Sequence, residues 1–217
     1  MEARVSPYEH PLPTILMHWV HIGALGVLTY TGLQIHSLSA VSESHSAGNI
    51  HMGVMPLFLG TAIIRFIWAF TGSGSAERGA FHRMSDWRHF VFHRGDGRAA
   101  MDWLACYAGI HKEAPPVLKY NPLQRAVYAF VFPILVVVLA ITGFSLSDSY
   151  VDSMAGITGF LGGEEQVRAL HTTAMWALLL LTALHSYAAF RDGLGRLSLM
   201  LTGWTPRSMR AQPDDEL

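Results

Sequence analysis

Four stretches of this 217-residue chain are each apolar and long enough to cross the ~30 Å hydrocarbon core of a bilayer as a helix. Hydrophobic residues make up 51% of the chain, charged residues only 14%, and the mean hydropathy is +0.28, which is typical of an integral membrane protein. We therefore predict an all-α membrane protein, a four-transmembrane-helix bundle that forms a single domain over residues 1–217. The expected spans are residues 13–35, 50–70, 126–146 and 169–190.

The net charge and the cysteine content exclude several classes of protein. The formal charge is −1 and no basic patch alternates with aromatic residues, so we expect no nucleic-acid partner. The single cysteine, Cys106, excludes an intrachain disulfide framework, a cysteine-rich iron–sulfur site and covalent haem attachment through Cys-x-x-Cys-His. The first span is too long for the core of a signal peptide and lacks a small-residue cleavage site, so we expect it to be retained.

The distribution of charge predicts the orientation in the membrane. Eight of the fifteen basic residues lie in the connection 71–125, and five more lie in the two terminal segments. Only Arg168 lies clearly on the other side, among acidic residues. The positive-inside rule therefore predicts that both termini, the polar tail 205–217 and this long loop are cytoplasmic. Within the loop, residues 81–92 mix bulky apolar and basic side chains, as an amphipathic helix on lipid headgroups does.

The fourth span carries a histidine at each end of an uncharged stretch, His171 and His185. Fourteen residues at ~1.5 Å rise separate the rings by about 21 Å along a helix, and the offset is near four full turns. Both histidines therefore point to roughly the same face. Ionisable residues inside an apolar span are costly and usually functional. The alternative, that each ring only hydrogen-bonds a neighbouring helix, is about equally well supported by this stretch alone.

Other histidines lie at matching depths in the first two spans. If neighbouring helices are antiparallel, His18 or His21 is level with His185 near the cytoplasmic side, and His51 is level with His171 near the outer side. Two pairs at two depths meet the requirement of two b-type haems, each iron held by two imidazoles. Zinc would need a third protein ligand, and a proton relay normally includes acidic residues, which the spans lack.

Two further sets of polar residues lie near the cytoplasmic ends of the spans. Arg65 lies about a turn and a half before the end of the second span, where its guanidinium can either extend to the interface or meet a carboxylate such as a haem propionate. Asn121 and Pro122 are typical of a helix start. This capping role leaves the neighbouring Tyr120 and Gln124 without an assigned function.

Several short motifs together resemble one family over roughly residues 10–205. They are His18-Trp19, Thr31-Gly32, Tyr120-Asn-Pro-Leu-Gln124 and the pair His171-x13-His185. The chain thereby resembles the di-haem cytochrome b subunits of nickel–iron hydrogenases, formate dehydrogenases and thiosulfate reductases, which are bacterial cytochrome b561-like proteins. The resemblance implies a multi-pass protein of the bacterial inner (cytoplasmic) membrane, in contact with lipid and with a partner redox enzyme that carries an iron–sulfur or haem centre.

The resemblance also implies the roles of individual residues. His18 and His185 would ligate the iron of an inner haem b, and His51 and His171 that of an outer haem b. We call these the inner pair and the outer pair. Asn121 and its neighbours Tyr120 and Gln124 would line a site for a quinone substrate near the inner haem. The implied function is electron transfer between the partner enzyme and the membrane quinone pool.

Two alternatives remain open from the sequence. One is a haem-free membrane anchor that only docks a soluble redox enzyme. The other is a self-standing b561-type quinone oxidoreductase.

Overall fold

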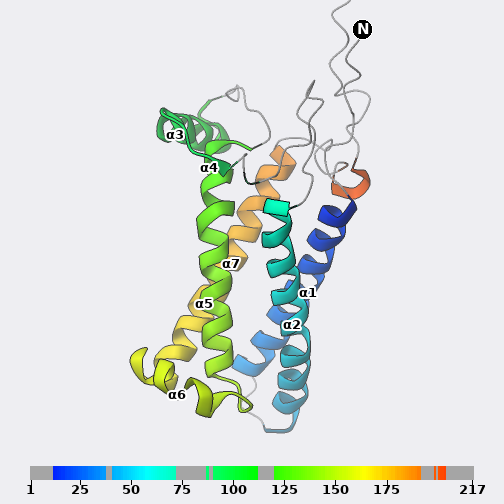
Figure 1. The fold of residues 1–217 in the computed structure, drawn as a ribbon, viewed down its shortest axis with the longest axis vertical. Helices are drawn as coiled ribbons and strands as arrows, with labels where there is room; N and C mark the ends of the chain where they lie inside the picture. The colour runs from blue at the N-terminus through cyan, green and yellow to red at the C-terminus, as the bar shows by residue number, and fades with distance from the viewer. Residues whose placement is uncertain are drawn as a thin grey trace, which may run out of the picture. The chain divides into compact units, whose positions relative to one another are not determined.

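Helices are the only regular secondary structure in the described part of the chain. The computed structural model describes residues 12–37, 41–71, 87, 90–111, 120–191, 198 and 200–203, and no strand occurs among these residues. In chain order the elements are α1 (Leu12–Ser37), α2 (Val41–Thr71), α3 (Asp96–Tyr107), α4 (Pro122–Ala126), the π-helical turn η2 (Val127–Val131), α5 (Phe132–Ser145), α6 (Val151–Phe160) and α7 (Glu164–Arg191) (Figure 1).

Four helical stretches are long and apolar enough to cross a membrane, which confirms the predicted all-α fold with four spanning helices. They are Leu12–His36, Ser46–Thr71, Pro122–Ser145 and Glu164–Arg191. Three of these helices start several residues before the predicted apolar windows, because backbone hydrogen bonding continues into the polar flank, as at Glu164. The predicted amphipathic segment 81–92 lies outside the described residues except for Trp87 and residues 90–92.

The third span begins with the predicted cap and changes pitch before a proline. Asn121 is the N-cap of α4, and its Oδ1 accepts from the Gln124 backbone N–H at 2.8 Å, while Gln124 Oε1 accepts from the Asn121 N–H at 3.1 Å. Pro122 occupies the first turn, where its missing N–H costs nothing. The π-helical turn ends two residues before Pro133, which has no N–H to donate to the preceding turn.

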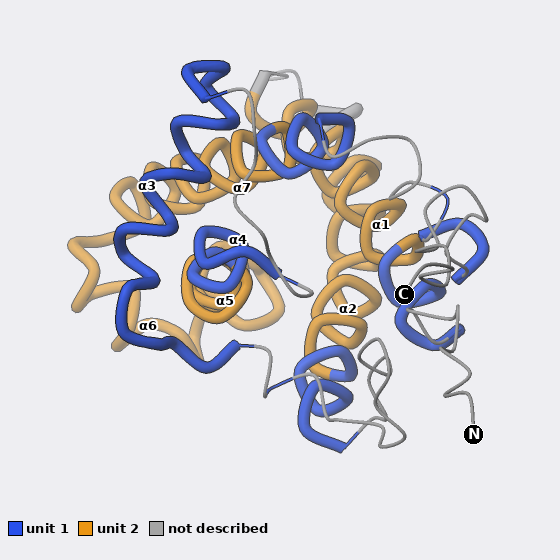
Figure 2. The backbone as a smooth tube through the Cα atoms, turned by 90° about the horizontal axis from the view of Figure 1, so that it is seen from above, with its two compact units in different colours: residues 1–18, 64–127, 184–217 blue, residues 19–63, 128–183 orange. Residues whose placement is uncertain are grey.

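The contacts divide the chain into two compact units (Figure 2). Unit 1 comprises residues 1–18, 64–127 and 184–217, and unit 2 comprises residues 19–63 and 128–183. The core of unit 2 takes one buried side chain from each of the four long helices. These residues are Ala24, Phe58, Val136 and Leu178. The four helices therefore pack as a bundle in this unit, and their apolar outer faces are left for lipid.

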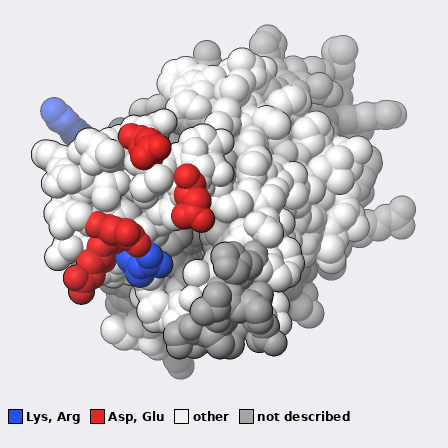
Figure 3. Space-filling model, turned by 90° about the horizontal axis from the view of Figure 1, so that it is seen from below, with Lys and Arg blue, Asp and Glu red and all other residues white. Residues whose placement is uncertain are grey.

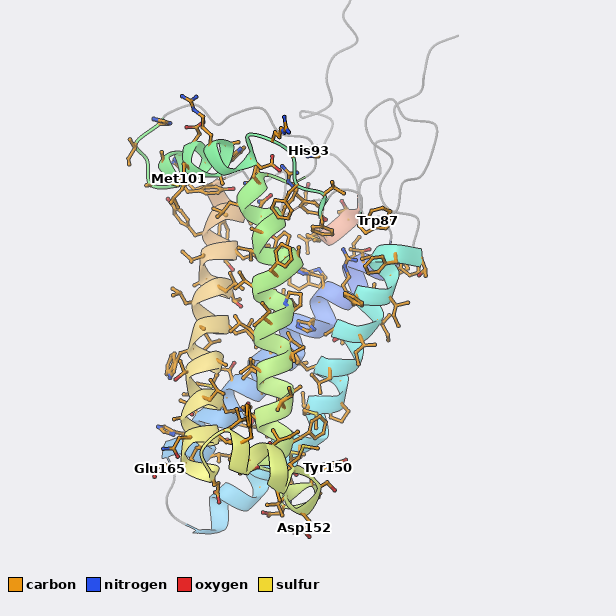
Figure 4. The ribbon with its side chains drawn as sticks, turned by 60° about the vertical axis from the view of Figure 1, so that its left-hand side comes forward. Trp87, His93, Met101, Tyr150, Asp152 and Glu165 are labelled. Carbon is orange, nitrogen blue, oxygen red and sulfur yellow. The ribbon has the colours of Figure 1, made fainter. Side chains whose placement is uncertain are left out.

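The connection between the third and fourth spans contains a helix, α6, that the sequence analysis did not anticipate. Gly162 and Gly163 have φ of 97° and 99°, a left-handed conformation that lets the chain turn from α6 into α7. Acidic side chains gather at α6 and the start of α7 (Figure 3), and Tyr150, Asp152 and Glu165 are labelled there in Figure 4. Glu164, another acidic residue at the start of α7, forms an ion pair with Arg168.

In unit 1, hydrogen bonds hold α3 to the ends of two spanning helices. Arg125, in the last turn of α4, donates to Asp96 Oδ1 at 2.8 Å and to the Val91 carbonyl at 2.6 Å. From α7, the Tyr187 hydroxyl donates to the Tyr107 carbonyl at 2.8 Å, and Arg191 donates to the Cys106 carbonyl at 3.0 Å. The helix is thus anchored at both of its ends. His93 and Met101 are labelled in this region in Figure 4.

Asp96 ionises more readily than an ordinary aspartate. Burial opposes its charge, but the His93 backbone N–H, which donates to Oδ2 at 2.7 Å, and the Arg125 guanidinium together outweigh that effect and lower the pKa of Asp96 below 3.8. A lowered carboxyl pKa contributes stability above the unfolded-state pKa, and this contribution is lost as pH falls through the folded-state pKa.

Replacement of Asp96 is expected to loosen α3. Asp96→Asn should lower the free energy of unfolding of the detergent-purified protein by about 1 kcal/mol at pH 7, because it removes the charge of one ion pair whose side chains are 16% and 12% exposed. The difference from wild type should shrink below pH 3.8. The control is Asp102→Asn on the same helix, because Asp102 forms no ion pair among the described residues. Equal effects of the two variants in chemical denaturation would contradict the assignment.

Candidate functional site: two histidine pairs

Each unit of the structure contains one of the two predicted histidine pairs. In unit 1, the ring of His18 on α1 faces that of His185 on α7, with centroids 6.2 Å apart and planes at 69°. In unit 2, the rings of His51 on α2 and His171 on α7 have centroids 6.5 Å apart and planes at 64°. One helix, α7, therefore supplies a histidine to both pairs.

The ring separations fit two imidazoles that share one metal ion. An imidazole–metal bond is about 2 Å long and the ring centre lies about 1.1 Å from its nitrogen, so two rings facing across one metal have centroids about 6 Å apart. Both observed separations are close to this value. No group of three or more histidine, cysteine or acidic residues that could hold a metal occurs in the described ranges. The geometry is thus that of two-ligand sites, which suits haem iron and not protein-bound zinc.

Two buried polar atoms in unit 1 suit contact with a bound organic group, and unit 2 has an apolar pocket. In unit 1, Thr14 Oγ1 and Trp68 Nε1 are buried and have no hydrogen-bond partner among the described residues; Thr14 lies one turn before His18. A polar edge of a bound group would satisfy such atoms. In unit 2, an apolar surface pocket of about 420 Å³ lies between α1 and α7, and its lining includes none of the paired histidines. It is lined by Ile22, Leu25, Gly26, Thr29, Tyr30, Leu33, Leu179 and Thr182.

The second candidate in the first span, His21, has different surroundings. Its ring packs 4.0 Å from the ring of Phe58 and 5.6 Å from that of Phe132. Its Nδ1 lies 3.0 Å from the hydroxyl of Thr61 on α2. His21 is thus packed against other aromatic rings in unit 2, while His18 faces His185 in unit 1.

Each histidine of the outer pair is contacted by a threonine and a glycine that are adjacent in sequence. The Thr31 hydroxyl on α1 lies 2.9 Å from His51 Nδ1, and the Thr142 hydroxyl on α5 lies 2.8 Å from His171 Nδ1. A Cβ at Gly32 would lie 3.5 Å from His51 Cε1, and one at Gly143 would lie 3.3 Å from His171 Cε1. The missing side chains therefore let the rings approach the backbones of α1 and α5.

The remaining predicted site residues all belong to unit 1. Arg65 is half-buried on α2, six residues before the helix ends at Thr71. Tyr120 stacks on Phe90 at 5.3 Å. Asn121 is 1% exposed, and besides capping α4 it donates from Nδ2 to the Tyr107 hydroxyl at 2.9 Å. The amide Nε2 of Gln124 takes no part in the capping box.

The sequence reasoning missed the contacts of Thr61, Thr142 and Tyr107 with His21, His171 and Asn121. A weak signal for one of them was present, because Thr142-Gly143 in the third span repeats the Thr31-Gly32 dipeptide of the first. The dipeptide alone gives no partner, since small residues and threonines also serve ordinary helix packing in membranes.

The fold and the two sites define a multi-pass helical membrane protein with paired intramembrane histidines. The family model described as prokaryotic cytochrome b561 matches residues 9–203, and the chain belongs to this family. It is therefore a b-type cytochrome, an electron-transfer protein that carries haem b.

Curated relatives are similar along most of their length. The chain is 28% identical to a protein of Cupriavidus necator over 91% of this chain and 84% of the relative. It is 26% identical to one of Rhodobacter capsulatus (92% and 80%) and 28% identical to one of Azotobacter vinelandii (93% and 89%). Each of these relatives is named as a probable Ni/Fe-hydrogenase B-type cytochrome subunit.

The close approach at Gly143 predicts a graded response to alanine. Gly143→Ala should lower the thermal unfolding temperature, because a 3.3 Å contact forces the His171 ring to shift. Gly32→Ala, with 3.5 Å to His51, should have a smaller effect. Gly53→Ala on α2 is the control: its Cβ would meet nothing within 4 Å, and alanine favours the helix by up to about 1 kcal/mol. A Gly143→Ala protein as stable as the Gly53→Ala protein would contradict the contact.

Proposed function

We propose that this chain is the membrane-embedded electron-transfer subunit of a nickel–iron hydrogenase complex and that it passes electrons between the hydrogenase and the quinone pool through two b haems. The observation that carries the proposal is the presence of two histidine pairs, at 6.2 Å and 6.5 Å, in a chain similar over its length to hydrogenase cytochrome subunits. We further propose that both termini are cytoplasmic, on the basis of the charge distribution, and that the membrane is the bacterial inner membrane, on the basis of the prokaryotic family and its hydrogenase relatives.

The histidines determine what kind of reaction the sites can support. When bound, haem supplies reversible one-electron oxidation and reduction at its iron. His18 and His185 would hold the iron of the inner haem, and His51 and His171 would hold that of the outer haem. Haem iron held by two protein imidazoles would favour electron transfer over oxygen binding. The helix α7 carries one proposed ligand of each site, His171 and His185.

Arg65 is proposed to hold a carboxylate of the inner group. It belongs to the same unit as the inner pair and is half-buried, and a guanidinium is well suited to a propionate. Trp68, one turn further along α2, has a buried indole N–H that can donate to the same kind of acceptor.

The quinone headgroup is proposed to bind at the segment Tyr120–Gln124, beside the start of α4. This segment belongs to the same unit as the inner pair. Asn121 is buried and bonded to both Gln124 and Tyr107, which supports a role in fixing the segment's conformation. The Nε2 amide of Gln124, which takes no part in the capping box, could donate to a quinone carbonyl, and Tyr120, stacked on Phe90, lies next to Asn121 in the same segment.

Haem stoichiometry tests the ligand assignment. The purified protein should contain two haems b per chain by pyridine haemochrome and iron analysis. His51→Ala and His18→Ala should each retain one haem, since the pairs share no ligand, and His21→Ala should retain both. Loss of a haem in His21→Ala with none lost in His18→Ala would move the inner ligand to His21. A haem-free wild-type protein would favour the anchor alternative.

Isolation of the complex tests the partner. An affinity-tagged chain from gently solubilised membranes should co-purify with hydrogenase subunits, and the complex should reduce a quinone analogue with hydrogen. A haem-loaded chain that purifies alone and oxidises quinol without hydrogenase would favour a self-standing oxidoreductase.

Two conservative variants test the quinone segment. Gln124→Glu keeps the capping-box acceptor but removes the amide donor, and it should raise KM for the quinone by about two- to tenfold, the value of one hydrogen bond of ~0.5–1.5 kcal/mol. Asn121→Asp keeps the cap and can accept from the Tyr107 hydroxyl, so its kinetics should stay near wild type. Both proteins should retain two haems. Unchanged KM in Gln124→Glu would place the quinone elsewhere.

A further inference from the structure

We propose that Thr31 and Thr142 are positioning residues for the outer histidine pair. Each hydroxyl accepts a hydrogen bond from the Nδ1–H of its histidine, and this bond fixes the tautomer and ring orientation in which Nε2 can ligate iron. The inference rests on the proposed haem-binding function and extends it to residues outside the ligand set.

The direction of each hydrogen bond follows from the other contact of the hydroxyl. Thr31 Oγ1 lies 2.8 Å from the Val27 carbonyl oxygen, and Thr142 Oγ1 lies 2.6 Å from the Val138 carbonyl oxygen. A carbonyl can only accept, and a hydroxyl has one hydrogen. The hydrogen of each hydroxyl therefore goes to the carbonyl. The contact with the histidine is then a hydrogen bond only if the imidazole Nδ1–H donates to the hydroxyl oxygen.

This arrangement selects the chemical form of the ring that a metal needs. A neutral imidazole with its proton on Nδ1 has its lone pair on Nε2. Metal-bound histidines generally donate their second ring N–H to an acceptor, which orients the ring and raises the basicity of the ligating nitrogen. In the outer pair both acceptors are buried threonine hydroxyls, at 2% and 1% exposure of the residue, so water does not compete for the bond.

Each threonine comes from a helix other than the one that carries its histidine. Thr31 on α1 holds His51 on α2, and Thr142 on α5 holds His171 on α7. The outer site thus depends on all four long helices, although only two of them supply ligands. Because a more basic imidazole stabilises the oxidised iron, loss of either bond should raise the reduction potential of the outer haem.

A third threonine provides a matched control. Thr61 is also buried, donates to the Leu57 carbonyl at 2.9 Å and lies 3.0 Å from a histidine Nδ1, that of His21. The histidine it contacts belongs to neither proposed pair. Removing this hydroxyl causes the same kind of local change without altering a proposed ligand.

The experiment uses the haem-loaded protein and the substitutions Thr31→Val, Thr142→Val and Thr61→Val, with Thr31→Ser and Thr142→Ser as conservative partners. Valine keeps the shape and removes the acceptor, whereas serine keeps the acceptor. Haem content and potentiometric titration of the absorption bands are measured, and the outer haem is identified as the redox step that His51→Ala lacks. Low-temperature electron paramagnetic resonance reports the axial-ligand environment.

The two valine variants of the outer pair should shift the outer step to higher potential, change its resonance signal and weaken haem retention roughly 10- to 100-fold. The serine variants should restore all three, and Thr61→Val should match wild type. If a valine variant fails to load haem at all, restoration by serine supports the proposal and failure of serine to restore overturns it.

Wild-type potentials and haem content in Thr31→Val and Thr142→Val, or an equal outer-haem shift in Thr61→Val, would overturn the proposal while leaving haem binding intact. A wild-type protein without haem would instead overturn the proposed function.

Discussion

The structure depends on satisfying the polar groups of histidines that lie within apolar helices. Hydrocarbon offers no water to an imidazole N–H, so an acceptor must come from another helix. Thr31 and Thr142 provide acceptors for the outer pair, and their own hydroxyl hydrogens go to carbonyls one turn back on the same helix. The two imidazole N–H groups and the two threonine hydroxyls therefore all find their acceptors within the helix bundle. What remains open on each ring is one nitrogen, which is what a metal ligand requires.

Helix packing makes this arrangement specific. The core of unit 2 draws Ala24, Phe58, Val136 and Leu178 from four different helices, so none of them can rotate without disturbing the others. The same rotation would move a threonine away from its histidine. In a membrane, where lipid tails are as apolar as the side chains, close packing and interhelical hydrogen bonds must hold helices together. The contacts that orient the histidines thus also contribute to assembly of the bundle.

The loop that the charge distribution predicts to be cytoplasmic is hydrogen-bonded to the proposed quinone segment. Tyr107, at the end of α3, accepts from Asn121 through its hydroxyl and from Tyr187 through its carbonyl. The start of α4 is therefore held by residues that are distant in sequence. This finding changes the interpretation of Asn121, because its buried amide already has protein partners on both sides.

The sequence by itself determined the helical class, the four spans, the cap at Asn121-Pro122 and the family, because these follow from local hydropathy, helix-start chemistry and motif spacing. It also predicted that His171 and His185 lie on one helix face. It did not distinguish His18 from His21, or reveal that Thr142 would meet His171. His18 and His21 are the same residue type, three positions apart in one apolar span, and a threonine's partner depends on the rotation and register of another helix. Only tertiary packing fixes those quantities, and it alone decided which side chains face one another.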